Sequence, residues 1–203
     1  MKKFLILMQL FFSTAFFASA QVQTEISQDE LARIYEEVKT PYKYGMVIAP
    51  QDNGHKIDCP TVFREGDSWY MTYVVYNGKT GQDGRGYETW LAKSSDLLHW
   101  KTLGRVLAYR DCNQRGGFPA LADMEWGGTY QLQQYKGRHW MTYLGGSGTG
   151  YESVREPLYV GVASTDKPIT EAHEWQASDK PILHIDDKDA QWWEKLTQYK
   201  STV

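Results

Sequence analysis

Carboxylates are the side chains in this sequence most suited to chemistry. Hydrolysis of a glycosidic bond needs two carboxyl groups flanking the scissile bond, one acting as acid and the other as base or nucleophile. Five acids fall in or beside polar loops that we expect to share one face of a β-structure: Asp58, Glu88, Asp123, Glu125 and Glu152. They are candidates for such a pair, but their spacing along the chain does not fix their separation in space.

Asp58 is the strongest of these candidates. It lies between Ile57 and Cys59-Pro60, where a short apolar strand begins. An unpaired carboxylate is costly at the entrance to a buried strand, so the residue needs a reason to be there. Either it belongs to a functional site, or it caps local backbone amides.

Glu125 and Asp123 compete for a second catalytic place. Both precede the stretch around Thr129, where we expect the innermost strand of a second structural unit to begin. The alternative is that they are solvated loop acids. His55 and Trp126 are candidates for contact with a sugar, since aromatic rings stack on sugar faces.

Glu88 and Glu152 occupy matching places in a repeated pattern. Glu88 follows Gly86-Tyr87, and Glu152 follows Gly150-Tyr151. Both could face a common cavity and bind substrate, or both could be a structural element of the repeat.

Other chemistries find no support in the residue pattern. The five histidines are scattered without metal-ligand spacing. We find no serine-triad motif and no nucleotide fingerprint, and we expect no cofactor and no bound metal.

The N-terminus predicts export. Residues 1–20 combine Lys2-Lys3, a short apolar run and a small-residue exit at Ala18-Ser19-Ala20. This is the pattern of a signal peptide, and the run is shorter than the ~20 residues a membrane span needs. We therefore expect a secreted or periplasmic protein with no membrane span.

The charge balance argues against a nucleic-acid partner. The chain has 22 basic and 25 acidic residues, and the signal peptide carries two of the basic ones. Phosphate binding favours a basic face, which this balance does not predict. Abundant aromatic residues and acids fit a carbohydrate partner better. Cys59 and Cys112 could pair after export, or Cys59 could be a small buried residue.

Residues 21–43 are expected to form a helical extension packed on the main body. Ser27 and Glu30 make a capping-box pattern, and apolar residues then recur at helical spacing. We predict a helix over 28–39, ending before Pro41.

From residue 44 the pattern becomes that of strands. We expect strands at 61–63, 68–76 and 87–94, and a broken fourth strand before 107. Four antiparallel strands in about fifty residues have the size of one β-propeller blade.

Landmarks of this unit return later in the same order. Trp69-Tyr70-Met71-Thr72-Tyr73 matches Trp140-Met141-Thr142-Tyr143, and Leu91–Asp96 matches Val162–Asp166. We expect an all-β partial propeller over 44–203, with blade one at 44–110, blade two at 111–186 and the start of blade three at 187–203. The alternative is a sandwich with two similar hairpins.

These motifs resemble the five-bladed β-propeller glycosidases, the superfamily of glycoside hydrolase families 43 and 32. The resemblance rests on Asp58-Cys59-Pro60 with Val62-Phe63, on Trp69–Tyr73 and on Gly86–Asp96 with His99-Trp100. The signal peptide is similar to those of the Bacteroidetes. The resemblance implies a glycosidase of poly- or oligosaccharides in which Asp58 is the general base. It implies a second Asp from blade two and an acid Glu from blade three.

Two blades and a stub cannot close a ring, so we expect a chain truncated at its C-terminus and inactive by itself. The general acid would then lie beyond Val203. A non-catalytic carbohydrate-binding propeller and a glycan phosphorylase of related fold are the alternatives.

Overall fold

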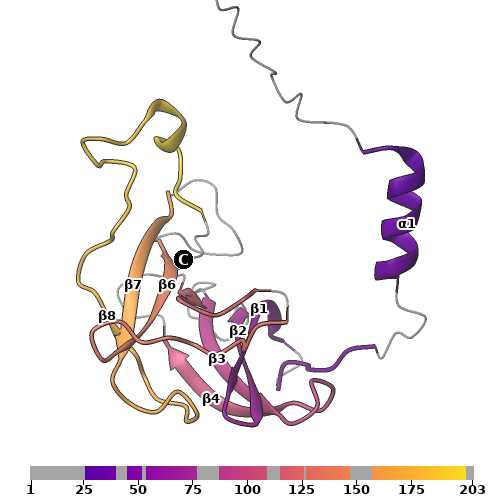
Figure 1. Cartoon of the computed structure of the whole chain (residues 1–203). Coiled ribbons are helices and arrows are strands. Elements are labelled where there is room, and N and C mark those ends of the chain that lie inside the picture. The colour runs from indigo at the N-terminus through magenta and orange to yellow at the C-terminus, as the bar shows by residue number, and fades with distance from the viewer. Residues whose placement is uncertain are drawn as a thin grey trace, which may run out of the picture. The chain divides into compact units, whose positions relative to one another are not determined.

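The computed structural model describes residues 26–39, 45–51, 54–76, 87–108, 115–125, 127–146 and 157–199. The chain divides into two compact units, residues 1–43 and residues 44–203. The described chain is mostly β, with two four-stranded antiparallel sheets and one α-helix (Figure 1). The expected signal peptide, residues 1–20, lies outside the described residues.

The first unit contains helix α1 (Gln28–Val38). Ser27 is its N-cap, and the Ser27 hydroxyl accepts a hydrogen bond from the backbone N–H of Glu30 at 3.2 Å. This bond satisfies one of the amides that a helix start leaves without a partner. The predicted helix is thus confirmed, with its end one residue earlier than expected.

The first sheet follows the chain order without a crossover. Its strands are β1 (Lys56–Glu65), β2 (Ser68–Tyr76), β3 (Tyr87–Ser94) and β4 (Lys101–Leu107). Strand β2 is buried on both faces, as expected for an inner strand, whereas β1 mostly alternates between exposed and half-buried residues. The predicted bounds of β2 and β3 are confirmed.

The second sheet repeats this order. Its strands are β5 (Gly116–Pro119), β6 (His139–Gly145), β7 (Tyr159–Thr165) and β8 (Gln176–Ala177). The repeat read from the sequence therefore corresponds to two four-stranded antiparallel sheets.

The first strand of the second sheet is not where the sequence pattern placed it. We expected it to begin near Thr129, but β6 pairs with Gly116–Pro119 instead. The described residues 121–125 and 127–133 belong to a small hairpin inserted between β5 and β6, with a bridge between Ala122 and Leu132. The expectation was wrong because counting back from β6 assumed a short turn, whereas this insertion lengthens the connection.

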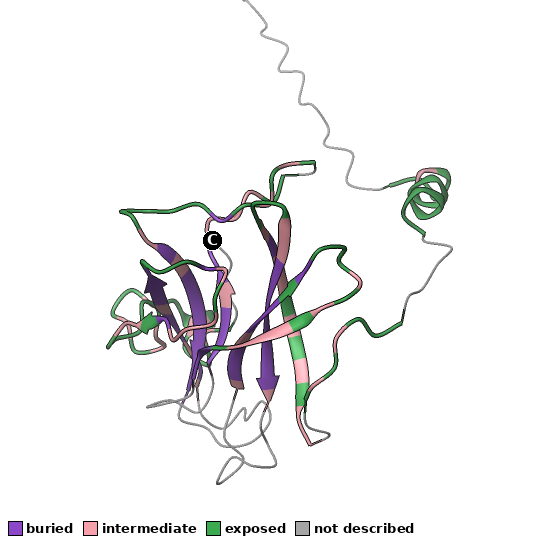
Figure 2. Cartoon of the chain, turned by 90° about the horizontal axis from the view of Figure 1, so that it is seen from below, coloured by how far each residue is buried: buried purple, intermediate pink, exposed green. Residues whose placement is uncertain are grey.

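The main core lies between the two sheets. Phe63 and Leu107 from the first sheet join Met141 and Ala163 from the second, and all four are at most 1% exposed. A fully buried side chain of the size of Phe63 or Met141 contributes about 1.5–3 kcal/mol to folding. Figure 2 shows the buried residues concentrated in the strands of both sheets. A second cluster covers the other face of the first sheet, around Met71, Tyr73 and Val75.

The expected start of a third unit contains no strand within the described residues 187–199. A single 3-10 turn, η1 (Trp192–Glu194), occurs there. In the described part of the chain, no helix is both long and apolar enough to cross a membrane.

Candidate functional site

Asp58 lies on the edge strand β1, opposite Val74 of β2. Its carboxylate is exposed, and Oδ1 accepts a hydrogen bond from the backbone N–H of Cys59 at 2.7 Å. The regular pairing shifts between Asp58 and Thr61, and Cys59 takes a φ of 50°. Such a bulge re-aims side chains, and a non-glycine residue at positive φ is uncommon. The expectation that Asp58 sits at a buried entrance is wrong, since β1 is an edge strand there.

The end of the sheets that holds Asp58 also holds the start of β5. The register places one described end of each of these strands there: Tyr76, Tyr87, Leu107, Gly116, Gly145 and Tyr159. The two sheets are joined at this end, because the backbone N–H of Arg115 donates to the carbonyl of Tyr87 at 3.0 Å. We call this end of the two sheets the loop end.

Asp123 and Glu125 lie at the opposite end. The backbone N–H of Asp123 donates to the carbonyl of Gln131, and Gln131 bridges Arg64, near the far end of β1. Six residues of strand separate Arg64 from Asp58, which is about 20 Å at ~3.3 Å per residue. Catalytic carboxyl pairs lie about 5–9.5 Å apart. The expectation that these two acids share a face with Asp58 is therefore wrong.

Asp123 instead organises its own loop. Its Oδ2 accepts hydrogen bonds from the Thr129 backbone N–H at 2.7 Å and from the Thr129 hydroxyl at 2.6 Å. These bonds from Thr129 lower the pKa of Asp123, with a smaller contribution from the backbone of Glu125. Glu125 itself is exposed.

Glu88 is buried within the first sheet, 4% exposed. One carboxylate oxygen accepts a hydrogen bond from Arg105 at 2.8 Å, and the other accepts one from the indole N–H of Trp90 at 3.2 Å. Both partners lie on neighbouring positions of the same sheet, so this geometry favours the structural interpretation of Glu88.

His55 precedes β1 and borders a small cavity of about 150 Å³ beside Tyr73 and Trp90. Its Nε2 is buried without a hydrogen-bond partner. The remaining predicted site residues, Trp126 and Glu152, lie outside the described residues. Cys112 does too, so its pairing with Cys59 stays one of the two alternatives read from the sequence; Cys59 itself is half-buried.

Arg115 is the residue at the loop end that sequence reasoning missed. Asp58 pairs with Val74 of β2, and Gly116 pairs with Leu144 of β6. Val74 and Leu144 hold the same place in the repeat, so Gly116 is the counterpart of Asp58 in the second sheet. Arg115 precedes this position, is 6% exposed, and holds its guanidinium carbon 5.4 Å from the centre of the Tyr143 ring. In the sequence, a single arginine before two glycines does not predict a functional position. Its place becomes clear only from the register of β5 with β6.

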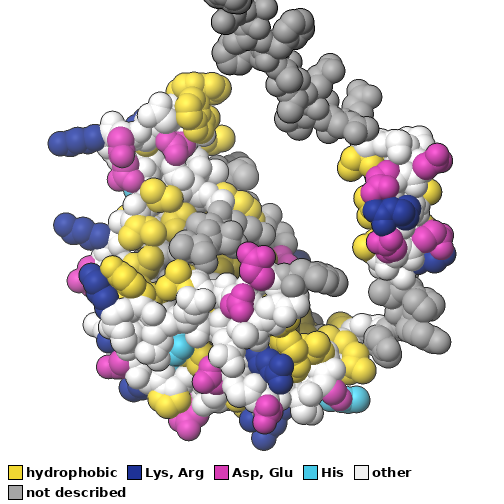
Figure 3. Space-filling view, viewed as in Figure 1, with side chains coloured by type: hydrophobic (Ala, Val, Ile, Leu, Met, Phe, Trp, Pro, Cys, Tyr) yellow, Lys and Arg dark blue, Asp and Glu magenta, His cyan; other side chains and the backbone are white. Residues whose placement is uncertain are grey.

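Metal chemistry has no candidate ligand cluster within the ranges that the structure describes. On the face of the β unit shown in Figure 3, acidic and basic side chains are interspersed rather than gathered into one basic patch.

Comparisons with known proteins place this fold among solved glycoside hydrolases. No protein-family model matches the chain, and no curated protein matches it. A solved structure named "Glycoside hydrolase" is 73% identical over 88% of this chain, with a TM-score of 0.79. A second, which is described as a complex of BT0996 and RGII, matches with the same identity, coverage and TM-score.

The chain spans about half the length of these two structures, 52% in each case. A family 117 glycoside hydrolase, Zg3597 from the marine bacterium Zobellia galactanivorans, is 16% identical, with a TM-score of 0.48. That match covers 68% of this chain and 42% of the other.

Proposed function

We propose that the protein is a glycoside hydrolase acting on poly- or oligosaccharides by carboxylate acid/base catalysis. The observation that carries this proposal is the 73% identity, over 88% of the chain, to a solved glycoside hydrolase.

The general base in this proposal is Asp58. Its carboxylate is exposed at the loop end, so a water molecule can reach it. The Cys59 amide engages Oδ1 and leaves Oδ2 to accept a proton. The bulge at Cys59 adds support, because backbone outliers of this kind gather at functional sites.

The architecture in this proposal is a five-bladed propeller, with the two sheets as its first two blades. The two sheets share one strand order and pack face to face through the main core, as adjacent blades do. The partner acid is a carboxyl group other than Asp123 or Glu125, because the hairpin that holds those two lies about 20 Å from Asp58 along β1.

The substrate of the whole protein is a glycan of the kind named for one similar structure, the RGII of the BT0996 complex. An exported enzyme meets such a polysaccharide outside the cytoplasm, in agreement with the N-terminal pattern at residues 1–20.

Replacing Asp58 tests the proposal. In the whole protein, Asp58→Asn keeps the shape of the side chain but removes the base. General-base catalysis contributes about 10²–10⁴-fold, so we expect kcat to fall by that factor with KM little changed. The matched control is Asp67→Asn, an exposed aspartate in the turn at the other end of β1.

Three outcomes would contradict the assignment. Unchanged turnover in Asp58→Asn would remove Asp58 from the chemistry. Binding of the glycan without turnover in the wild-type protein would indicate a carbohydrate-binding propeller. Cleavage that depends on added phosphate would indicate a glycan phosphorylase.

A further inference from the structure

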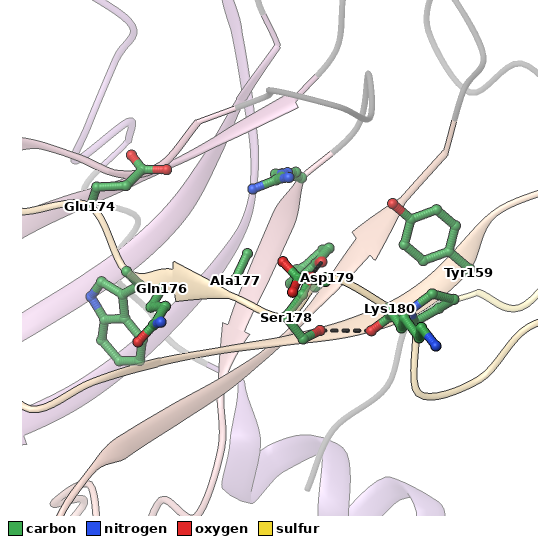
Figure 4. Close-up of a pocket in the computed structure, with 11 residues that line it drawn as sticks. Tyr159, Glu174, Gln176, Ala177, Ser178, Asp179 and Lys180 are labelled. Carbon is green, nitrogen blue, oxygen red and sulfur yellow. Dashed lines mark hydrogen bonds between the residues drawn. The ribbon is translucent and has the colours of Figure 1, made fainter.

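A cavity of about 720 Å³ opens at the loop end, along the face of the second sheet that meets the first. Its lining includes Arg115, which precedes β5, and the segment after β8 with Ser178, Asp179 and Lys180. In the view of Figure 4, Glu174 and Tyr159 stand on opposite sides of the group, with Asp179 between them. Its volume is that of a small-ligand site.

Two tyrosines that line the cavity pack closely against glycines of the neighbouring strand. Tyr143 of β6 is paired with Gly161 of β7, and Tyr159 of β7 is paired with Gly145 of β6. A Cβ atom at either glycine would come within 2.2 Å of the opposite ring. Only glycine permits this approach, so each ring packs directly against the backbone of the neighbouring strand.

The two rings differ in what covers them. Tyr143 packs against Gly161 and under the Arg115 guanidinium, and it is 3% exposed. Tyr159 is half-buried and lines the cavity. The His184 ring lies beside it, tilted, with 6.1 Å between the ring centres. An aromatic ring that lines a cavity can stack on the C–H face of a sugar ring.

Polar groups complete the lining. The Ser178 hydroxyl donates to the carbonyl of Lys180 at 2.7 Å, and this bond holds the turn that contains Asp179. Asp179 and Lys180 are exposed, and no hydrogen bond or ion pair within the described structure engages either side-chain charge. A carboxylate accepts hydrogen bonds and an ammonium donates them, so the pair can bind adjacent sugar hydroxyls.

The charges of the lining are balanced. Arg115 and Lys180 are positive, and Glu174 and Asp179 are negative. Glu174 also accepts a hydrogen bond from the backbone N–H of Ala108 at 3.1 Å, which connects the part of the lining before β8 to the end of β4. A lining with no net charge favours a neutral, hydroxyl-rich ligand over a polyanion.

We propose that this cavity binds a glycosyl unit of a neutral oligosaccharide. Tyr159 stacks on the sugar ring, and Asp179 and Lys180 bind its hydroxyl groups. The proposal takes its ligand class from the proposed glycosidase function, but it requires no catalysis in this chain.

The test is binding of neutral trisaccharides to the 203-residue chain, measured by saturation-transfer NMR and titration calorimetry. The probes are galactotriose, arabinotriose and xylotriose, with trigalacturonate as the anionic comparison. We expect at least one neutral probe to bind, and Asp179→Asn to raise its Kd about fivefold, since the amide keeps only part of a charge-assisted hydrogen bond. The matched control, Asp189→Asn, changes an exposed acid outside the cavity and should leave the Kd unchanged.

Tyr159→Leu should abolish the binding, provided that its melting curve shows a folded chain; if the variant unfolds, Asp179→Asn decides. The proposal is overturned if no neutral probe binds, if Asp179→Asn and Asp189→Asn bind alike, or if only trigalacturonate binds. Failure of the glycosidase proposal looks different. If the glycosidase proposal is wrong, Asp58→Asn leaves turnover in the whole protein unchanged, and this result does not depend on whether trisaccharides bind at Tyr159.

Discussion

Substitution of Glu88 tests most directly whether an acid of this sheet is structural or catalytic. Its carboxylate is buried and bonded at both oxygens, to Arg105 at 2.8 Å and to Trp90 at 3.2 Å. Glu88→Gln keeps the size of the side chain and an acceptor for Trp90, but it removes the charge that faces Arg105. We expect the variant to lose stability and to keep its activity.

The magnitude follows from the burial of the pair. Losing a hydrogen bond between charged groups costs about 1.5–3 kcal/mol. The Arg105 side chain is 47% exposed, so water screens part of this interaction and we expect a loss of about 1–2 kcal/mol. For a chain of this size, ~1 kcal/mol lowers Tm by about 2–4 °C, so Tm should fall by about 2–8 °C.

Thermal and urea unfolding followed by circular dichroism measure this change. Glu125→Gln is the control, because an exposed acid in a loop should change stability by less than about 0.5 kcal/mol. Arg105→Met alone should be at least as destabilising, because it leaves the Glu88 carboxylate buried without its cation. A Glu88→Gln variant that melts like the wild type, while hydrolysis by the whole protein falls a hundredfold, would refute the structural role.

Two further predictions concern the second sheet and its hairpin. Gly161→Ala places a Cβ about where the Tyr143 ring lies, and overpacking of this kind should cost about 1–3 kcal/mol in urea unfolding. Adding Tyr143→Val should recover part of that loss, and a double variant less stable than the sum of the single ones would contradict the clash. Bonds from Thr129 lower the pKa of Asp123 in the folded state, so its stabilisation is present above the ordinary aspartate pKa and is lost as pH falls through the lowered one. Asp123→Asn should therefore weaken the loss of stability at acid pH. Urea unfolding from pH 6 to about pH 2 measures this dependence. A loss of stability in the variant as steep as that in the wild type would show that Asp123 is not its source.

Local features of the first sheet could be predicted from the sequence. The helix start at Ser27 follows from a hydroxyl three residues before Glu30, and the structure makes that bond. The bounds of β2 and β3 follow from apolar and aromatic runs between polar turns. These signals are short-range, since each depends on residues within one turn or one strand.

The candidate site could be predicted only in part, for a physical reason. Asp58 is recognisable because it interrupts a strand pattern. The location of Asp123 and Glu125 was missed because their hairpin resembles, in sequence, a turn leading into a first strand. Arg115 was missed because its place depends on which segment pairs with β6, and Gly116–Pro119 shows no alternation of its own.

Local residue patterns were enough to predict the helix cap, the bounds of β2 and β3 and the repeat of a four-strand unit. Which segment became β5 depends on packing between strands that are distant in the chain. Gly117 lies so close to Met141 and Thr89 that a Cβ there would come within 2.7 Å and 2.9 Å of their side chains. That fit depends on two strands distant in the chain. The pairing of β5 with β6 places Arg115 at the loop end, where the pairing of β1 with β2 places Asp58. The inserted hairpin leaves Asp123 at the other end.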